Sequence, residues 1–307
     1  MESTPTKTPI AVYGAIAANI VIAVSKFIAA AVTGSSAMLS EGIHSLVDTG
    51  NELLLLLGLK QSQKPEDQDH PFGHGTELYF WSLIVAILLF GIGGGMSIYE
   101  GITHLQHAPE KANPIWNYVV LSVAFVSESV SWTIAMREFR TGKRKERFWP
   151  AFLSSKDPTV FTVLAEDSAA MVGLLIAFLG VLLGDILKLP AFDGIASILI
   201  GAVLAGVAVF LIGQSRGLLI GESADAEVIR RIRELAESDQ NVKGVGAILT
   251  MYFGPETILL NMDVVFEASL TGSDLAETVD RLEESIRNEF PEVKRIFIET
   301  KSVRRIL

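Results

Sequence analysis

The chain has 307 residues, of which 50% are hydrophobic, and its mean hydropathy of +0.41 is too high for an ordinary soluble domain. It contains no cysteine, which excludes disulfides and thiolate metal sites. The net charge of −10 provides no broad basic surface, so nucleic acid is not an expected partner. Of its 25 basic and 35 acidic side chains, 29 lie in the last 94 residues, which favours a membrane domain followed by a soluble one.

Six apolar stretches are each long enough to cross a bilayer as a helix, which takes roughly 20 residues. Turn residues and polar stretches separate them. We expect transmembrane helices at residues 9–33, 37–59, 78–102, 115–136, 160–183 and 195–212. The polar residues 1–8 precede the first stretch without an obvious cleavage site, so we expect this helix to be retained rather than removed as a signal peptide.

Lysine and arginine residues in the short loops predict the orientation of these helices. With the amino terminus inside, the basic residues of the inner segments are Lys7, Lys60, Lys64, Arg137, Arg140, Lys143, Arg144, Lys145, Arg147 and Lys156, and those of the outer loops are Lys111 and Lys188. We therefore expect both termini on the cytoplasmic side. The expected membrane is a bacterial plasma membrane, with an organelle membrane as the alternative.

The carboxyl-terminal part has the pattern of a small α+β domain. Its predicted elements are helices at 225–237 and 275–290 and strands at 245–253, 257–266 and 293–299. Gly254-Pro255-Glu256 is expected to form a hairpin turn, and Ser273 to cap the second helix. The order αββαβ predicts two helices on one face of a three-stranded sheet, in a module small enough that we expect dimerisation through it. We thus predict a transmembrane domain at 1–213 and a cytoplasmic regulatory or dimerisation domain at 214–307.

The second predicted span contains ionisable residues, which cost about 2.5 to 3.5 kcal/mol each at the centre of a membrane helix. His44 and Asp48 are four residues apart, so both side chains lie on one helix face. An imidazole nitrogen and a carboxylate oxygen suit a divalent metal such as zinc. We expect them to share a metal ion, and the alternative is a helix-packing hydrogen bond. Glu41 and Glu52, about one turn to either side, either line the ion path or extend towards the membrane surfaces.

Glu166 and Asp167 form a second acidic group, in the fifth predicted span. Adjacent helical positions diverge by about 100°, so we expect one to bind metal directly and the other to orient it or relay protons. His44, Asp48 and at least one of these two carboxylates would then form a site between two helices. Because metal requires deprotonated ligands, metal and protons compete there, and two alternately open conformations turn that competition into metal/proton antiport.

His70 and His74 lie in the predicted inner loop that follows the second span, in the segment Asp69-His70-Pro71-Phe72-Gly73-His74-Gly75. Two histidines four residues apart among proline and glycine indicate either a metal site or a fixed turn between helices. Both interpretations stay open from the sequence.

Two smaller signals concern the other spans. The third span contains Gly91, Gly93, Gly94 and Gly95, which we expect to permit close approach of another helix. Lys26 in the first span is either a partner in a polar interior or, since it lies near enough to the helix end, extends its ammonium group to the membrane surface.

These residues resemble the cation diffusion facilitator family. The resemblance rests on the segment Ser40–Asp48, on His70-Pro71-Phe72-Gly73-His74-Gly75 followed by Glu77, and on six helices followed by a compact module. It covers nearly the whole chain. It implies that the second and fifth helices jointly hold a transported divalent cation, usually zinc, which protein dimers exchange for protons. It also implies a ferredoxin-like inner module that often binds regulatory metal.

Two features depart from the family pattern. The fifth helix of the family commonly has histidine or aspartate four residues before an aspartate, whereas Val163 stands four before Asp167, so Glu166 and Asp167 must substitute. All five histidines lie at or before His107, so a histidine-rich regulatory site is not expected in residues 214–307.

An enzyme is the rival class. Residues 213–217 match the G-x-S-x-G string of serine hydrolases, but they follow a membrane helix and no histidine lies downstream. No histidine begins an H-E-x-x-H metalloprotease motif. A non-transporting scaffold or metal-sensing receptor acting through the carboxyl-terminal domain is the remaining alternative.

The sequence therefore predicts a proton-coupled efflux transporter, and not an enzyme. Its expected partners are a divalent transition metal, protons, the lipid bilayer and a second copy of the chain. Zn²⁺ is the preferred substrate, with Mn²⁺, Co²⁺, Fe²⁺ and Ni²⁺ as alternatives, and no organic cofactor is expected.

Overall fold

The computed structural model describes residues 9–107, 115–142, 148–153 and 155–301. The chain divides into two compact units, one of Met1–Gly58 with Trp81–Ser215 and the other of Leu59–Phe80 with Arg216–Leu307. The predictions for residues 1–8, Lys111 and the basic residues 143–147 concern positions outside the described residues.

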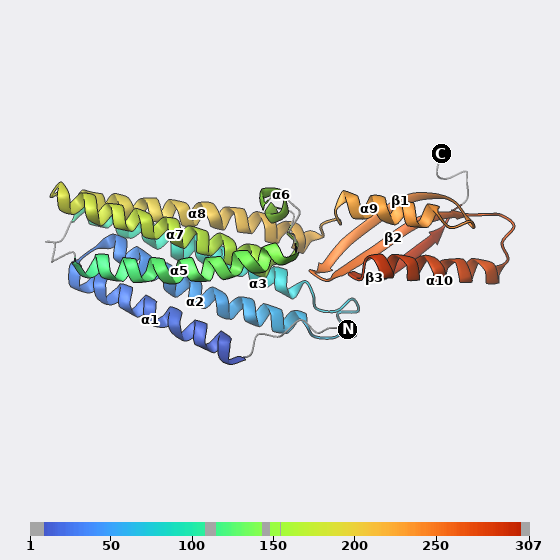
Figure 1. Cartoon of the computed structure of the whole chain (residues 1–307), viewed down its shortest axis with the longest axis horizontal. Helices are drawn as coiled ribbons and strands as arrows, with labels where there is room; N and C mark the ends of the chain where they lie inside the picture. Colours follow the sequence, from blue (N-terminus) through green and yellow to red (C-terminus); the bar gives the residue numbers. More distant parts are fainter. Residues whose placement is uncertain (1–8, 108–114, 143–147, 154, 302–307) are drawn as a thin grey trace. The chain divides into compact units, whose positions relative to one another are not determined.

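The first unit is a bundle of long helices, as Figure 1 shows. The helical elements along the chain are α1 (Pro9–Thr33), α2 (Ser36–Ser62), α3 (Glu77–Leu88), the π-helix η1 (Leu89–Gly95), α4 (Met96–Gln106), α5 (Ile115–Gly142), α6 (Phe148–Leu153), α7 (Pro158–Ile186) and α8 (Ala191–Ile220). Each of the six predicted spans falls on this helical structure. The third span is not one regular α-helix, because η1 interrupts it.

Within the described residues, four helical stretches are long and apolar enough to cross a membrane. They are Glu77–Gln106, Ile115–Arg137, Pro158–Ile186 and Ala191–Ile220. The apolar part of α1, Asn19–Thr33, is shorter, and α2 is long enough but carries too many polar side chains to be counted among the four.

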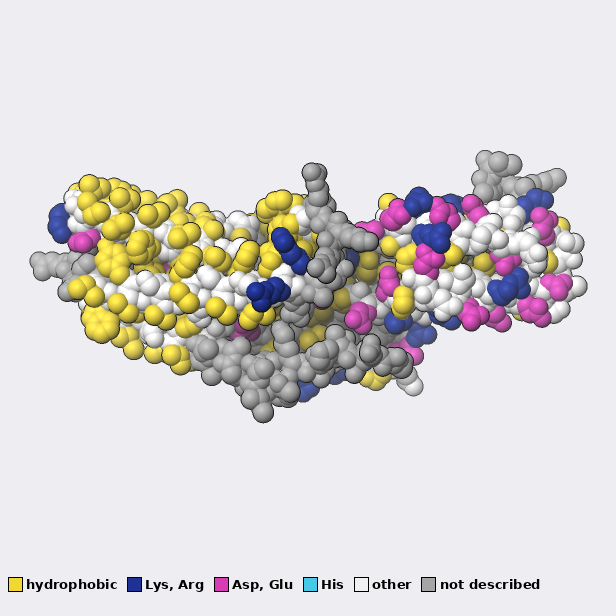
Figure 2. All heavy atoms as spheres, viewed as in Figure 1, with side chains coloured by type: hydrophobic (Ala, Val, Ile, Leu, Met, Phe, Trp, Pro, Cys, Tyr) yellow, Lys and Arg dark blue, Asp and Glu magenta, His cyan; other side chains and the backbone are white. Residues whose placement is uncertain are grey.

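The exterior of the helical unit is apolar, and Figure 2 shows hydrophobic side chains over its visible face. Val21 and Ile28 on α1 and Val123 and Val126 on α5 are between 59% and 64% exposed. Small residues fill the interior instead, and α7 buries Ala169, Ala170, Gly173, Ala177 and Gly180 on its inner face. An apolar surface with small residues between the helices is typical of helices packed in lipid.

Glycine pairs bring α8 close to the helix formed by η1 and α4. A Cβ atom on Gly101 would lie 2.6 Å from the carbonyl oxygen of Gly194, and one on Gly201 would lie 2.7 Å from that of Gly94. No larger residue fits at either pair without moving a backbone. The close approach expected for the glycines of the third span is confirmed at Gly94, whereas Gly91 has no such neighbour among the described residues.

A side chain from α8 caps the amino terminus of α2. The buried Asp193 carboxylate accepts the backbone N–H of Ser36 at 2.6 Å and the hydroxyl of Ser35 at 2.7 Å. The first N–H groups of a helix have no partner within the helix, so this carboxylate satisfies groups that would otherwise be buried unpaired. His104 of α4 lies beside it, with Nε2 3.7 Å from Oδ2.

The second unit contains a three-stranded sheet covered by two helices on one face (Figure 1). Its elements are α9 (Ala226–Glu237), β1 (Val242–Gly254), β2 (Thr257–Phe266), α10 (Gly272–Glu289) and β3 (Val293–Thr300). The strand order is β1-β2-β3, with β1 and β2 antiparallel and β2 and β3 parallel. The predicted αββαβ order and hairpin turn are confirmed.

The core of this unit lies between the helices and the sheet. Ile232 of α9 and Ile286 of α10 are buried against Ile258, Leu260 and Met262 of the central strand β2, all at 0% exposure. Every second residue of β2 points to this core, as its alternating pattern requires.

The cap predicted for α10 is wrong by two residues. Thr271, not Ser273, accepts the backbone N–H of Asp274, and the Asp274 carboxylate accepts the N–H of Thr271 in return. This reciprocal capping box satisfies two helix-end donors, whereas a serine inside the first turn satisfies none.

Replacing Asp193 by alanine removes the cap of α2 and leaves buried N–H and O–H groups unpaired. We expect a loss of about 1–3 kcal/mol of stability, seen as a lower midpoint of thermal unfolding followed by tryptophan fluorescence in detergent. Asp185→Ala is the matched control, since Asp185 is exposed and pairs with Lys188 on the surface. Equal midpoints for the two variants would contradict the role of Asp193.

Candidate functional site

His44 and Asp48 lie together inside the helical unit. Both project from α2, with His44 Nδ1 3.4 Å from Asp48 Oδ1, and the His44 side chain is 1% exposed. Neither ring nitrogen of His44 nor Asp48 Oδ1 has a hydrogen-bond partner in the part of the chain that the structure describes. Buried polar atoms in native proteins almost always have a partner, so these three atoms are available to a ligand.

Glu166 faces α2 from α7. Its carboxylate is buried and accepts a hydrogen bond of 2.7 Å from the side-chain amide of Asn51, one turn beyond Asp48 on α2. Asp167 turns the other way, as its adjacent position requires, and accepts the hydroxyl of Ser131 on α5 at 3.0 Å. The two neighbouring carboxylates therefore have different helices as partners.

The acidic residues of these helices form one electrostatic group. Asp48 interacts with Glu166, Asp167 and Glu128 of α5. Glu166 and Asp167 also interact with Glu52 of α2, whose carboxylate accepts the side-chain amide of Asn19 at 3.0 Å. So many carboxylates in a low-dielectric interior repel one another unless a cation or protons balance them.

The predicted transport residues are near one another without forming a closed set of ligands. Among the described residues, the three-membered group of histidine and acidic ligand atoms within 4.8 Å of one another is Asp67, His70 and His74, and no such group contains His44 or Asp48. Within the described residues, His44 and Asp48 thus form a pair without a third histidine or acidic ligand atom at that distance.

Of the two alternatives for Lys26, the partner in a polar interior is confirmed and the extension to a membrane surface is wrong. Its side chain is fully buried, and the ammonium group donates to Glu41 at 3.1 Å and to the hydroxyl of Ser45 at 2.7 Å. Glu41 is likewise fully buried. Of the two alternatives for Glu41, extension to the surface is therefore wrong, because the lysine of the neighbouring helix neutralises it in the interior.

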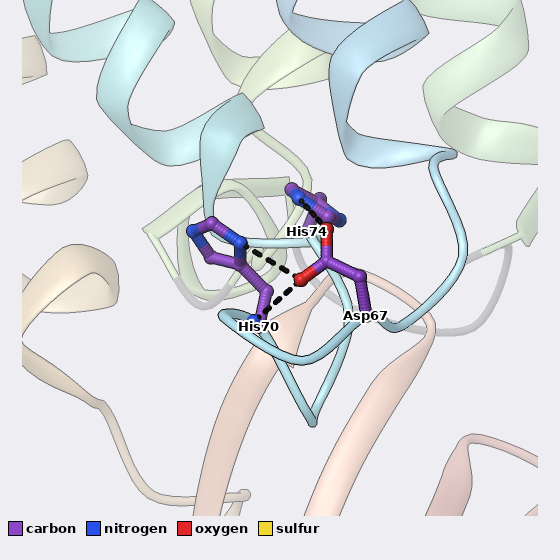
Figure 3. A group of neighbouring side chains, drawn as sticks. All are labelled: Asp67, His70 and His74. Carbon is purple, nitrogen blue, oxygen red and sulfur yellow. Dashed lines mark hydrogen bonds and ion pairs between the residues drawn. The ribbon is translucent and has the colours of Figure 1, made fainter.

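The loop between α2 and α3 contains the second group, drawn in Figure 3. Asp67 Oδ1 lies 3.3 Å from His70 Nδ1, and Asp67 Oδ2 lies 3.4 Å from His74 Nε2. The two imidazole rings are 4.3 Å apart between centroids. Two imidazoles and a carboxylate that converge in this way are a donor set suited to zinc.

The hydrogen bonds around the loop orient these ligands. His74 Nδ1 lies 3.1 Å from the carbonyl oxygen of Pro65, which can only accept, so Nδ1 carries the proton and Nε2 faces Asp67. Ligating histidines commonly use such a carbonyl to fix the ring. The backbone N–H of His70 lowers the pKa of Asp67, with smaller effects from the His70 ring, the Asp69 N–H and His74, so this exposed carboxylate stays ionised.

The same loop packs on the hairpin of the second unit. The rings of Phe72 and Phe253 are 5.1 Å apart between centroids, and Glu66 forms an ion pair with Arg295. Gly75 lies so close to the carbonyl oxygen of Phe253 that no side chain fits there. The glycines and the aromatic residue of the loop therefore hold its shape, and the side chains of Asp67, His70 and His74 converge within it.

Sequence reasoning missed three of the polar groups at these sites. Asp67 stands three residues before His70, and this spacing was the signal that could have been used. Asn51 follows Asp48 by three residues on the same helix face. Ser131 has no distinguishing pattern, because a single serine in an apolar helix usually bonds to its own backbone.

Both units match one protein family. Residues 12–220 match the cation efflux transmembrane domain, and residues 224–302 match the cation efflux protein cytoplasmic domain. The chain therefore belongs to the cation efflux family, the cation diffusion facilitators that its motifs resemble, and it is an integral membrane protein. The members of this family are transporters rather than enzymes, which agrees with rejecting the hydrolase string.

Particular relatives carry metal-specific names. The chain is 33% identical over 271 residues to the mitochondrial proton-coupled zinc antiporter SLC30A9 of Xenopus laevis, covering 88% of this chain and 48% of that protein. It is 26% identical over 287 residues to the manganese efflux system protein MneP of Bacillus subtilis, covering 92% of both chains. The chain thus spans about half the length of the antiporter.

A solved carboxyl-terminal domain of MamM in a nickel form is 20% identical to this chain. It covers 25% of this chain and 98% of that one, with a TM-score of 0.24, which is too low to bear on the fold.

Proposed function

We propose that this chain is a proton-coupled efflux transporter of divalent transition-metal cations, with zinc as its first substrate. The observation that carries the proposal is the buried pair of His44 and Asp48, whose facing atoms have no hydrogen-bond partner among the described residues. The neighbouring carboxylates of α7 provide the additional negative charge that a divalent cation requires. Family membership and a relative named as a proton-coupled zinc antiporter support the same function.

In the proposed site, His44 and Asp48 bind the metal from α2 and Glu166 binds it from α7. Glu166 is preferred over Asp167 as the direct ligand because it is buried and is held towards α2 by Asn51. Asp167, bonded to Ser131 of α5, is assigned the role of orienting the site or relaying protons. Metal entry displaces protons from these groups and proton entry expels metal, which couples the two fluxes when the site opens alternately to each side.

Zinc is favoured over harder ions by the imidazole ligand. A relative named for manganese efflux supports a broader range, so Mn²⁺, Co²⁺, Fe²⁺ and Ni²⁺ are the alternative substrates. A single nitrogen among oxygen ligands gives only modest discrimination between these ions.

The proposed architecture has six membrane-spanning segments: α1, α2, the combined α3–η1–α4, α5, α7 and α8. Residues 214–307 form the cytoplasmic domain, with a ferredoxin-like arrangement, and the chain acts as a homodimer joined through this domain. The match of residues 224–302 to the cytoplasmic domain of the family supports this division. The excess of lysine and arginine in the inner loops supports cytoplasmic termini, and we assign the protein to a bacterial plasma membrane.

We also propose that Asp67, His70 and His74 bind a second metal ion at the cytoplasmic loop. The convergence of three ligand atoms within 4.8 Å supports this site. Its position in the sequence, directly after α2, suits either ion capture or stabilisation of the loop.

Asp48→Asn removes one anionic ligand with little change in volume. We expect proton-driven ⁶⁵Zn²⁺ uptake into proteoliposomes to fall at least about 100-fold, since the metal loses a carboxylate in a dry site. The exposed Asp185→Asn is the matched control and retains full flux. A scaffold or receptor would show no saturable uptake even with the wild-type chain, and undiminished flux in Asp48→Asn would contradict the assigned ligand.

His44→Asp replaces the softer nitrogen ligand by an oxygen. We expect the ratio of Mn²⁺ to Zn²⁺ flux to rise by roughly tenfold, because oxygen ligands suit the harder ion. Competition between the two ions in proteoliposomes measures this ratio, and His107→Asp, at an exposed histidine, is the control. An unchanged ratio would exclude His44 as the residue that sets metal preference.

His74→Ala should remove the loop site without removing transport. We expect calorimetric titration of the detergent-solubilised protein with Zn²⁺ to lose one site per chain, while Asp48-dependent flux persists. The wild-type loop site should also weaken on acidification, because protonated imidazoles cannot bind metal. If His74→Ala and His107→Ala bind the same number of Zn²⁺ ions as the wild type, the loop is a turn and not a metal site.

A further inference from the structure

Lys26 carries a buried positive charge in the helical unit. It lies in α1 with a side-chain exposure of 0%, and it is the one lysine or arginine in the buried class among the described residues. A lysine in the middle of a bundle of membrane helices is costly, so its retention calls for a compensating role.

Two residues of α2 hold the Lys26 ammonium group. It donates to Glu41 Oε2 at 3.1 Å and to Ser45 Oγ at 2.7 Å. These residues flank the proposed metal ligand, since Glu41 lies three positions before His44 and Ser45 directly follows it. The tethered charge is thus fixed beside the metal site.

Gly173 of α7 leaves space for the ion pair of Lys26 and Glu41. A Cβ atom on Gly173 would lie 2.6 Å from Glu41 Oε1, so any larger residue would displace the carboxylate. Glu41 Oε1 has no hydrogen-bond partner within the described residues. Among the described residues, Lys26 is therefore the cationic partner of Glu41. The glycine on α7 leaves enough space for this ion pair.

The field of Lys26 extends to the two proposed ligands on α2. Its positive charge acts on His44, Asp48 and Glu128 as well as on Glu41. The acidic groups around the site are Glu41, Asp48 and Glu52 on α2, Glu128 on α5, and Glu166 and Asp167 on α7. Of these carboxylates, Lys26 acts on Glu41, Asp48 and Glu128.

A purely structural role does not account for this arrangement. A buried ion pair contributes little stability compared with well-packed apolar residues, so packing α1 against α2 does not require one. A transporter, by contrast, must bind its ion strongly enough to capture it and weakly enough to release it. A permanent positive charge beside the site lowers the affinity for a divalent cation by direct repulsion.

We propose that Lys26, held by Glu41 and Ser45, is a built-in counter-ion of the transport site that limits its affinity for the divalent cation and so permits release. Lys26 is in this sense a positioning residue and not a ligand. The inference rests on the proposed transport function, and it adds a determinant of affinity that lies outside the ligand set.

The test compares Lys26→Met, Glu41→Gln and the double variant at one fixed pH. Lys26→Met removes the repelling charge, so we expect the dissociation constant for Zn²⁺, measured by calorimetry in detergent, to fall by roughly tenfold or more. Turnover in proteoliposomes should fall with it, because release slows. Glu41→Gln leaves the lysine without its neutralising partner, so we expect Zn²⁺ binding to weaken by a similar factor, and the double variant to lie between the two.

The matched surface controls are Lys188→Met and Asp185→Asn, which alter an exposed ion pair of the same unit. Solvent screens that pair, so we expect each control to change the affinity by less than about twofold. Lys26→Arg retains the charge and should keep affinity near that of the wild type.

If the Zn²⁺ affinity changes in opposite directions in Lys26→Met and Glu41→Gln, the counter-ion role is supported. An ion pair with a purely structural role would weaken Zn²⁺ binding in both variants. If the Zn²⁺ affinity changes in the same direction in both variants, the proposal is overturned. If Lys26→Met does not fold, the double variant is compared with Glu41→Gln. Tighter Zn²⁺ binding in the double variant supports the proposal, because the repelling charge has been removed, and unchanged or weaker binding contradicts it.

Failure of the proposed function has a different signature. In that case the wild-type chain moves no Zn²⁺ and resembles Asp48→Asn. The counter-ion inference fails alone under a different result. In that result the wild type transports Zn²⁺ and Asp48→Asn does not, but the Zn²⁺ affinities of Lys26→Met and Glu41→Gln do not change in opposite directions.

Discussion

The cost of burying charge in an apolar bundle is the constraint on which this structure depends. Water cannot solvate a polar side chain there, so each needs a partner from the protein. The partners come from neighbouring helices: Asn51 of α2 donates to Glu166 of α7, and Ser131 of α5 donates to Asp167. These bonds join α2, α5 and α7 around the His44–Asp48 pair, whose facing atoms are left without hydrogen bonds in the described chain. A cation is the occupant that we propose for this site.

The same constraint explains how α2 is held. Its amino terminus receives the Asp193 carboxylate of α8, so the orphan N–H groups of a polar helix are satisfied inside the bundle. Glycine contacts bring α8 against α4, and η1 precedes α4 as a stretch of π-helix. Such π-helical segments are frequent at functional sites, since they change the rotation of the residues that follow. Helix ends and glycine contacts thus determine which face of each helix turns inward.

Patterns within single elements predicted most of the fold. Each of the six apolar stretches predicted from hydropathy lies on helical structure, and the change to alternating and amphipathic periods located α9, α10 and the three strands. These patterns did not decide two positions. Lys26 was left open between a surface and a polar interior because it lies near a helix end, and the ion pair with Glu41 on the next helix holds it inside. Ser273 is a good cap residue by type, but Thr271 is the one from which the chain enters α10.

By itself, the sequence determined the residue types and their spacing: His44 and Asp48 on one helical face, Glu166 beside Asp167, and His70 four residues before His74. Helical period and side-chain chemistry are local properties, so they can be predicted from the sequence without coordinates. Only the tertiary structure decided that Glu166 faces α2 while Asp167 faces α5, that Asp67 joins the loop histidines, and that a lysine of α1 lies beside the site. Those outcomes depend on the rotation and packing of whole helices. Many contacts between segments distant in sequence set that rotation and packing together, and no single motif encodes it.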